Sequence, residues 1–126
     1  MDTSAWLAFA NHADDAHAAV REVLTRFGGR LVTTNFVFDE TVTLCRRMGH
    51  AAALLVGGVL RDPEVVDLVR VRPGDENDAW RLFGERADKV YSFTDCTSFV
   101  LMRRLGIGRA AALDADFARE GFEVAP

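Results

Sequence analysis

Residues 31–49, LVTTNFVFDETVTLCRRMG, contain the pattern that decides the fold. Residues 31–33 form a short apolar run suited to a strand, and Thr34 or Asn35 then opens a helix that ends at the following glycine. Glu40 lies one turn inside that helix, next to a Phe-Val-Phe run that looks buried. Because a glutamate on or beside an apolar face needs a partner, this strand-to-helix turn is a candidate functional position.

The same order of strand, acidic turn and helix recurs along the chain. Alternating strands and helices favour an α/β fold, here a three-layer α/β/α sandwich with a central parallel sheet. With 126 residues and 49% hydrophobic composition, the chain fits a single domain over residues 1–126. The other expected helices cover about residues 7–10, 16–27, 51–60, 77–86, 95–105 and 117–119, and the other expected strands cover 65–71, 110–113 and 122–124.

Acidic residues stand at four of these turns, which we expect to converge in space. Ligand sites of α/β proteins lie outside the carboxyl ends of the strands, where strand-to-helix turns project their side chains. Two carboxylates about 4 Å apart repel by about 4 kcal/mol, so such a cluster requires protonation or a divalent cation. Ligands that are all oxygen suit Mg²⁺ or Mn²⁺ better than Zn²⁺. The candidate metal-binding and catalytic residues are Asp2, Glu40, Asp95 and Asp114, with Asp116 as a further candidate metal ligand.

Each of these residues also has an ordinary structural explanation. Asp2 can cap the first helix, and Asp95 lies in the first turn of its helix, where a negative charge is favoured by about 0.3–1 kcal/mol. One of Asp114 and Asp116 can cap a short helix while the other points into the cleft. The functional interpretation depends on all of them occupying equivalent places in the α/β order.

The other residues that could carry chemistry show no matching pattern. Cys45 and Cys96 lie in apolar helical patterns without CxxC spacing, which indicates free buried thiols and a reducing compartment. His12, His17 and His50 are scattered with no pairing that suggests a metal site or a catalytic triad, and we expect surface histidines. No glycine-rich phosphate loop is present.

Composition limits the possible partners and the compartment. A net charge of −4 argues against a protein that holds nucleic acid through a general basic field. A nuclease remains compatible, because bound divalent ions reverse the local sign where a phosphate docks. The longest apolar stretch, residues 51–60, is too short to cross a bilayer, and no export signal is visible. We therefore expect a cytoplasmic protein with no membrane partner.

Four stretches, in their order along the chain, give a family resemblance that spans almost its whole length. The chain resembles the PIN-domain ribonucleases of the VapC toxin type, from type II toxin–antitoxin pairs. The resemblance implies a pocket holding Mg²⁺ or Mn²⁺, formed by Asp2, Glu40, Asp95 and Asp114 with Asp116 as an accessory carboxylate. The matching stretches are DTSAWLA (2–8), TTNFVFDETVTLCRR (33–47), SFTDCTSFVLMRRLGI (92–107) and LDADFAREGFEV (113–124).

The resemblance also implies an activity and partners. The expected reaction is metal-dependent hydrolysis of RNA phosphodiester bonds, which leaves 5′-phosphate and 3′-hydroxyl ends. Partners would be the RNA substrate, a cognate VapB-type antitoxin whose peptide covers the pocket, and a second copy of the chain. Apolar residues among Trp6, Phe9, Phe36 and Phe38 are candidates for the antitoxin groove. Two alternatives stay open: a PIN nuclease outside a toxin pair, and a catalytically silent RNA-binding PIN domain.

The start of the chain departs from this family pattern. Such proteins carry several apolar residues before the first aspartate, which form a central strand, whereas only Met1 precedes Asp2 here. The strand is then either reduced to a stub or completed by residues upstream of Met1. We expect a missed upstream start, which a longer reading frame would reveal.

Overall fold

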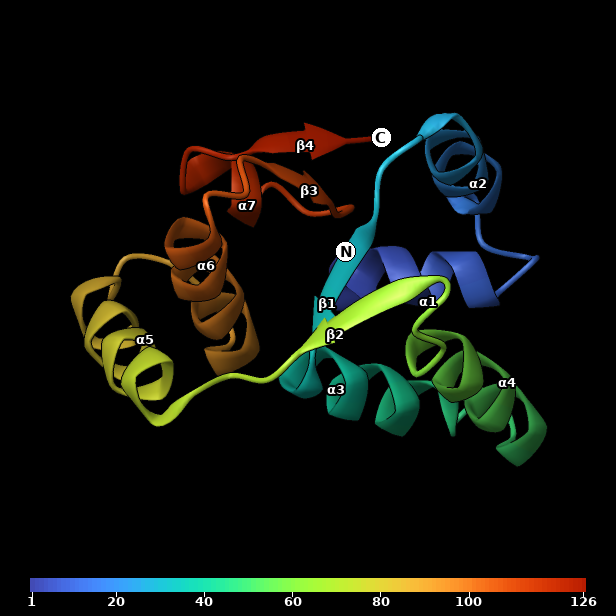
Figure 1. Ribbon diagram of the computed structural model, residues 1–126, viewed down its shortest axis with the longest axis horizontal. Helices are drawn as coiled ribbons and strands as arrows, with labels where there is room; N and C mark the ends of the chain where they lie inside the picture. Colours follow the sequence, from blue (N-terminus) through green and yellow to red (C-terminus); the bar gives the residue numbers. More distant parts are fainter.

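Two pairs of parallel strands form the centre of the molecule (Figure 1). The computed structural model describes residues 1–126. Strand β1 (Leu31–Thr34) pairs with β2 (Val66–Val69), and β3 (Arg109–Ala111) pairs with β4 (Glu123–Ala125). Every connection between paired strands contains helices, as parallel pairing requires.

The first two residues of the chain lie between the two strand pairs. The Met1 ammonium donates a hydrogen bond of 2.6 Å to the Val32 carbonyl, and the Thr33 hydroxyl donates one of 3.2 Å to the Met1 carbonyl. On the other side, the Asp2 N–H donates to the Ala111 carbonyl at 2.9 Å. These bonds place a two-residue stub in the central position and connect β1 to β3. The order across the molecule is therefore β2, β1, stub, β3, β4.

Helices cover both sides of these strands and confirm the predicted α/β fold. Figure 1 shows the α5 and α6 pair on one side of β1 and β2 and the α1 and α2 pair on the other. Helix α3 packs against α1, α4 and α6. The helices are α1 (Thr3–Ala10), α2 (His17–Arg26), α3 (Asn35–Cys45), α4 (His50–Leu60), α5 (Pro73–Glu85), α6 (Phe93–Leu105) and α7 (Asp116–Arg119).

Two large apolar clusters hold the layers together. One is centred on Phe99 of α6, which packs edge-on against Tyr91 and Phe117. The other includes Trp6 of α1 together with residues of α3, α4 and β2. Both cysteines are buried and free, as predicted. No helix is both long and apolar enough to span a membrane.

Two helix starts differ from the sequence prediction. Helix α5 begins at Pro73 and not near residue 77, because proline fits the first helical position and the Asp75 carboxylate accepts the Arg72 N–H at 2.9 Å. Helix α1 begins at Thr3 and not at residue 7, because Asp2 caps it directly.

Candidate functional site

Asp2 lies in the central stub and is almost fully buried. Its Oδ2 accepts hydrogen bonds from the Ser4 N–H at 3.1 Å and the Ser4 hydroxyl at 2.8 Å, which is the helix cap expected from the sequence. The Ser4 Oγ also accepts the Leu113 N–H at 3.0 Å, which ties the end of β3 to α1. Asp2 Oδ1 is buried without a hydrogen-bond partner. A buried carboxylate oxygen with no donor is costly, so this atom indicates a place for a cation or water.

Asp95 lies in the first turn of α6 and points back to the start of that helix. Its Oδ2 accepts the Ser92 N–H at 2.7 Å, and the Ser92 hydroxyl accepts the Asp95 N–H at 3.0 Å, which forms a capping box. The pKa of Asp95 is raised to about 6, chiefly by burial and to a smaller extent by the negative charges of Asp2 and Asp114, while the hydrogen bonds from Ser92 act in the opposite direction. Asp95 is thus held close to two other carboxylates.

Asp114 follows β3 and is joined to Asp116. Its Oδ1 accepts the Asp116 N–H at 3.0 Å. Burial raises the pKa of Asp114, and the charges of Asp2 and Asp116 act in the same direction. Asp116 itself forms an ion pair of 2.6 Å with Arg119.

The structure therefore brings three of the predicted residues within electrostatic reach of one another. Asp2, Asp95 and Asp114 come from three distant segments, and the charge of Asp2 adds to burial in raising the pKa of both Asp95 and Asp114. Glu40 is half-buried on α3 and forms no ion pair. No three side chains of His, Cys, Asp or Glu are arranged closely enough to hold a metal ion by themselves. The roles of Glu40 and Asp116 as ligands stay predictions.

Comparison with known proteins identifies the family. The model of the PIN domain matches residues 1–123. Two curated relatives, each a "23S rRNA-specific endonuclease VapC20" from Mycobacterium tuberculosis, one from strain CDC 1551 / Oshkosh and one from strain ATCC 25618 / H37Rv, are 38% identical over 128 residues. Each alignment covers 100% of this chain and 97% of the relative. The chain belongs to the VapC family of PIN-domain toxins.

A solved structure of this VapC family supports the same assignment of the fold. The crystal structure of Mycobacterium tuberculosis VapC20, described as a sarcin–ricin loop cleaving toxin, superposes with a TM-score of 0.93 and 37% sequence identity. The superposition covers 99% of this chain and 97% of that one. The α/β architecture predicted from the sequence is therefore that of a VapC-type PIN domain.

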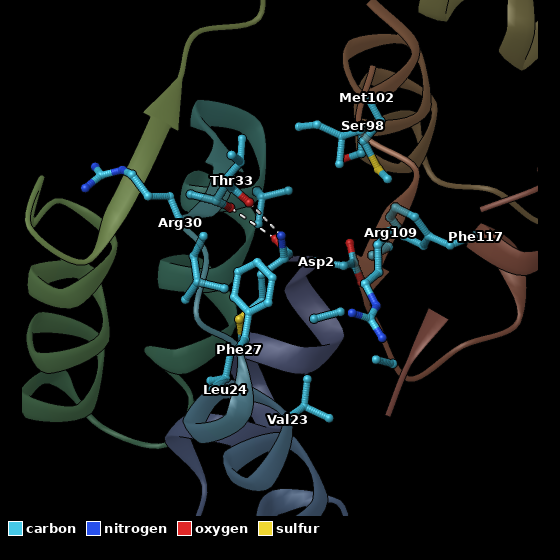
Figure 2. Close-up of a pocket in the computed structure, with 18 of the residues that line it drawn as sticks. Asp2, Val23, Leu24, Phe27, Arg30, Thr33, Ser98, Met102, Arg109 and Phe117 are labelled. Carbon is cyan, nitrogen blue, oxygen red and sulfur yellow. Dashed lines mark hydrogen bonds between the residues drawn. The ribbon is translucent and has the colours of Figure 1, made fainter. Parts of the chain in front are cut away.

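A cavity of about 680 Å³ opens beside the acidic residues of this PIN domain. Figure 2 shows Asp2 at its wall, with Leu24 and Phe27 of the α2 region on one side and Arg109 and Phe117 on the other. Most of the lining residues are hydrophobic. Residues of β1, β3, α2 and α6 line it. Asp2 is the one candidate carboxylate among its lining residues, whereas Asp95 and Asp114 do not line it.

The structure adds a contact between two of the histidines and removes Trp6 from the candidates for the antitoxin groove. His12 and His17 are paired, with 3.1 Å between His12 Nδ1 and His17 Nε2, because the turn between α1 and α2 folds one against the other. The sequence gives no periodic signal for this His12–His17 contact, because the two residues are five positions apart across the end of a helix. Trp6 is 1% exposed and belongs to the core, so it cannot line an open groove. Phe9, Phe36 and Phe38 are half-buried.

Proposed function

We propose that this VapC-family chain is a toxin that hydrolyses RNA phosphodiester bonds with Mg²⁺ or Mn²⁺ at the acidic crevice. One observation carries the proposal: Asp2, Asp95 and Asp114 come from three distant segments, and the charge of Asp2 adds to burial in raising the pKa of both Asp95 and Asp114. Carboxylates held this close are unfavourable without a cation, and a nuclease uses the cation to meet a phosphate. The relationship to a 23S rRNA-specific endonuclease supports the same chemistry.

The residues present fit a hard divalent cation. Asp2 Oδ1 is buried and has no hydrogen-bond partner, and the pKa of Asp95 is raised to about 6 chiefly by burial. We propose that Asp2, Asp95 and Asp114 hold the ion, with Glu40 and Asp116 nearby. When bound, the ion would lower the pKa of a water molecule in contact with it and neutralise negative charge on the RNA phosphate. Glu40 has no ion-pair partner, so its carboxylate is free to orient the attacking water.

The relatives suggest a substrate and partners. Both curated relatives are named for 23S rRNA, and the solved structure is described as cleaving the sarcin–ricin loop. We propose large-subunit ribosomal RNA as the substrate, cut to leave 5′-phosphate and 3′-hydroxyl ends. We also propose a VapB-type antitoxin that covers the crevice and a homodimer through helices. Leu54 and Leu55 of α4 are 64% and 74% exposed, which makes α4 a candidate dimer surface.

The test compares matched variants on RNA. Purified protein is incubated with total RNA in Mg²⁺, in Mn²⁺ and in EDTA, and new 5′ ends are mapped. Asp95→Asn keeps an oxygen that can accept the Ser92 N–H, so the helix cap and the fold should survive while cleavage is lost. Asp39→Asn, which changes an exposed carboxylate beside Glu40, is the control and should cleave normally.

Three results would contradict the proposal. Cleavage by Asp95→Asn at a near-normal rate would remove that residue from the mechanism. Cleavage by the wild-type protein in EDTA would show that the reaction does not need a divalent cation. Absence of any new 5′ end under all conditions would favour a catalytically silent RNA-binding domain.

A further inference from the structure

Helix α5 presents two exposed aromatic rings that no part of this chain covers. Trp80 is 69% exposed and Phe83 is 41% exposed. Their ring centroids are 5.9 Å apart and their planes differ by only 12°, so the two rings are stacked and hold each other in one orientation. Figure 1 shows α5 as the outer helix of its pair, with α6 between it and the strands. The rings thus form a fixed aromatic face open to solvent.

Phe93 connects this face to the start of α6. The Phe93 ring lies edge-on to Trp80 and Phe83, with centroid distances of 6.3 Å to each. On its other side it contacts Phe36 of α3, at 6.1 Å. Phe93 opens α6, whose first turn also carries Asp95. A row of aromatic rings therefore leads from α3, past the first turn of α6, to the open face of α5.

The inner end of this row also reaches the second acidic helix. Phe36 and Glu40 are four residues apart on α3, so they lie on the same face of that helix, one turn from each other. The aromatic row thus begins beside both helices that carry candidate catalytic carboxylates. A substrate bound at the carboxylates would meet these rings next.

A shallow hollow extends from the aromatic pair. Its volume is about 620 Å³, and its lining includes Trp80, Phe83 and Gly84 of α5 together with Val90 and Tyr91 of the following loop. A side chain added at Gly84 would meet nothing within 4 Å, so the helix surface there is open. The hollow offers room for a flat group to lie against the exposed indole.

Charge and chemistry favour RNA as the occupant. Arg70 and Arg72 are exposed, form no ion pair, and lie on the segment that joins β2 to α5. Their guanidiniums can contact phosphates beside the aromatic row. Proteins recognise single-stranded RNA by stacking unpaired bases on aromatic side chains while cationic groups follow the backbone. An apolar peptide would offer no negatively charged group to pair with the two unpaired arginines.

We propose that Trp80, held by Phe83, stacks with a nucleobase of the RNA close to the cleaved phosphodiester. The inference rests on the proposed ribonuclease function and assigns Trp80 as a positioning residue for that substrate. Phe93, which lies edge-on to the Trp80 ring, is two residues before Asp95 at the start of α6. Because every base has a flat face, this contact favours an unpaired loop over a duplex and does not read a particular sequence.

The test separates binding from chemistry. In steady-state cleavage of a single-stranded oligoribonucleotide, Trp80→Ala should raise KM by about 5- to 100-fold and leave kcat within about threefold, since loss of one stacked base has effects of that order. Trp80→Phe keeps a flat ring and should recover most of the affinity. Leu105→Ala, which trims a 42% exposed side chain at the far end of α6, is the control and should change neither constant.

A fluorescence titration gives a readout that does not depend on cleavage. The chain has two tryptophans, and Trp6 is buried, so stacking should quench the emission of Trp80 selectively. The titration uses a 12-nucleotide single-stranded RNA in EDTA, and Trp80→Phe should remove the quenching.

The possible failures are distinguishable. Cleavage with an unchanged KM for Trp80→Ala overturns the stacking role and leaves the ribonuclease in place. Quenching of the Trp80 emission by RNA without any cleavage overturns the proposed ribonuclease activity and leaves the proposed base-stacking site in place. If Trp80→Ala leaves KM unchanged and also converts a dimer to a monomer on size-exclusion chromatography, RNA is not the occupant of the aromatic face. That face would then bind a second copy of the chain.

Discussion

Replacing Glu120 by Gln should destabilise the protein by about 2 kcal/mol at pH 7. The Glu120 side chain is 4% exposed and accepts hydrogen bonds from Arg86 at 2.7 Å and Arg103 at 2.7 Å. These arginines, Arg86 first, lower the pKa of Glu120 to about 2 from an ordinary value of 4.5. Each pH unit between the folded and unfolded pKa is worth about 1.4 kcal/mol, which gives about 3 kcal/mol. Because both guanidiniums are partly exposed, solvent screening reduces the expected effect to about 2 kcal/mol.

The sign of the pH dependence gives a second check. A carboxylate with a lowered pKa stabilises the folded state above its unfolded pKa and loses that contribution as the pH falls toward the folded value. Wild type should therefore lose stability between pH 4.5 and pH 2, and the difference from Glu120→Gln should shrink over that range. Urea unfolding followed by circular dichroism at pH 7 and pH 3 measures both quantities.

The matched control is Glu123→Gln on β4. Glu123 pairs with Arg109 at 2.9 Å, but both side chains are at least 60% exposed, so its loss should change the free energy of unfolding by less than about 0.5 kcal/mol. Equal effects of the two substitutions, or a difference for Glu120→Gln that stays constant from pH 7 to pH 3, would refute the reasoning.

Three further substitutions test other parts of the structure. In EDTA at pH 7, Asp95→Asn should stabilise the protein by about 1–2 kcal/mol, because burial raises the pKa of Asp95 to about 6 and makes its charged form unfavourable in the folded protein. Urea unfolding should show that this gain disappears as the pH falls to about 4, where Asp95 of the wild-type protein is protonated. Gly106→Ala should cost about 1 kcal/mol by urea unfolding without changing RNA cleavage, since Gly106 ends α6 at a φ of 68°. Arg104→Met should lower the free energy of unfolding by about 2–3 kcal/mol and the thermal midpoint with it, because it leaves the buried Asp75 carboxylate without its bidentate partner. An unchanged midpoint would mean that the Arg72 N–H alone satisfies Asp75.

The starts of α3 and α6 were predictable because each has a local capping signal, although the strand expected before Asp95 is absent, since α6 follows α5 directly. Thr34 caps α3 through the Val37 N–H, and Ser92 caps α6 through the Asp95 N–H, in agreement with the residue types at those turns. Helix ends with glycine were equally clear, as at Gly106. The order of elements, and with it the fold class, followed from these signals.

Contacts between distant segments were not predictable from the same signals. The aromatic row joins residues of α3, α5 and α6 whose separation in sequence carries no periodicity. Leu82 and Phe83 are neighbours on α5, yet Leu82 is 7% exposed whereas Phe83 is 41% exposed and stacks on Trp80. Tertiary packing, and not helical spacing, decided these positions.

Helix capping and metal binding are compatible roles for the acidic residues, although the sequence presents them as alternatives. Asp2 uses Oδ2 for the Ser4 cap and leaves Oδ1 buried without a partner. Asp95 and Asp114 likewise use one oxygen each for a local turn, which fixes the carboxylate and leaves its second oxygen free. A carboxyl group can therefore be oriented by its own helix and still face a shared cation. Asparagine at Asp95 keeps the oriented oxygen and removes the charge, so loss of cleavage in a folded Asp95→Asn protein would isolate the role of the charge alone.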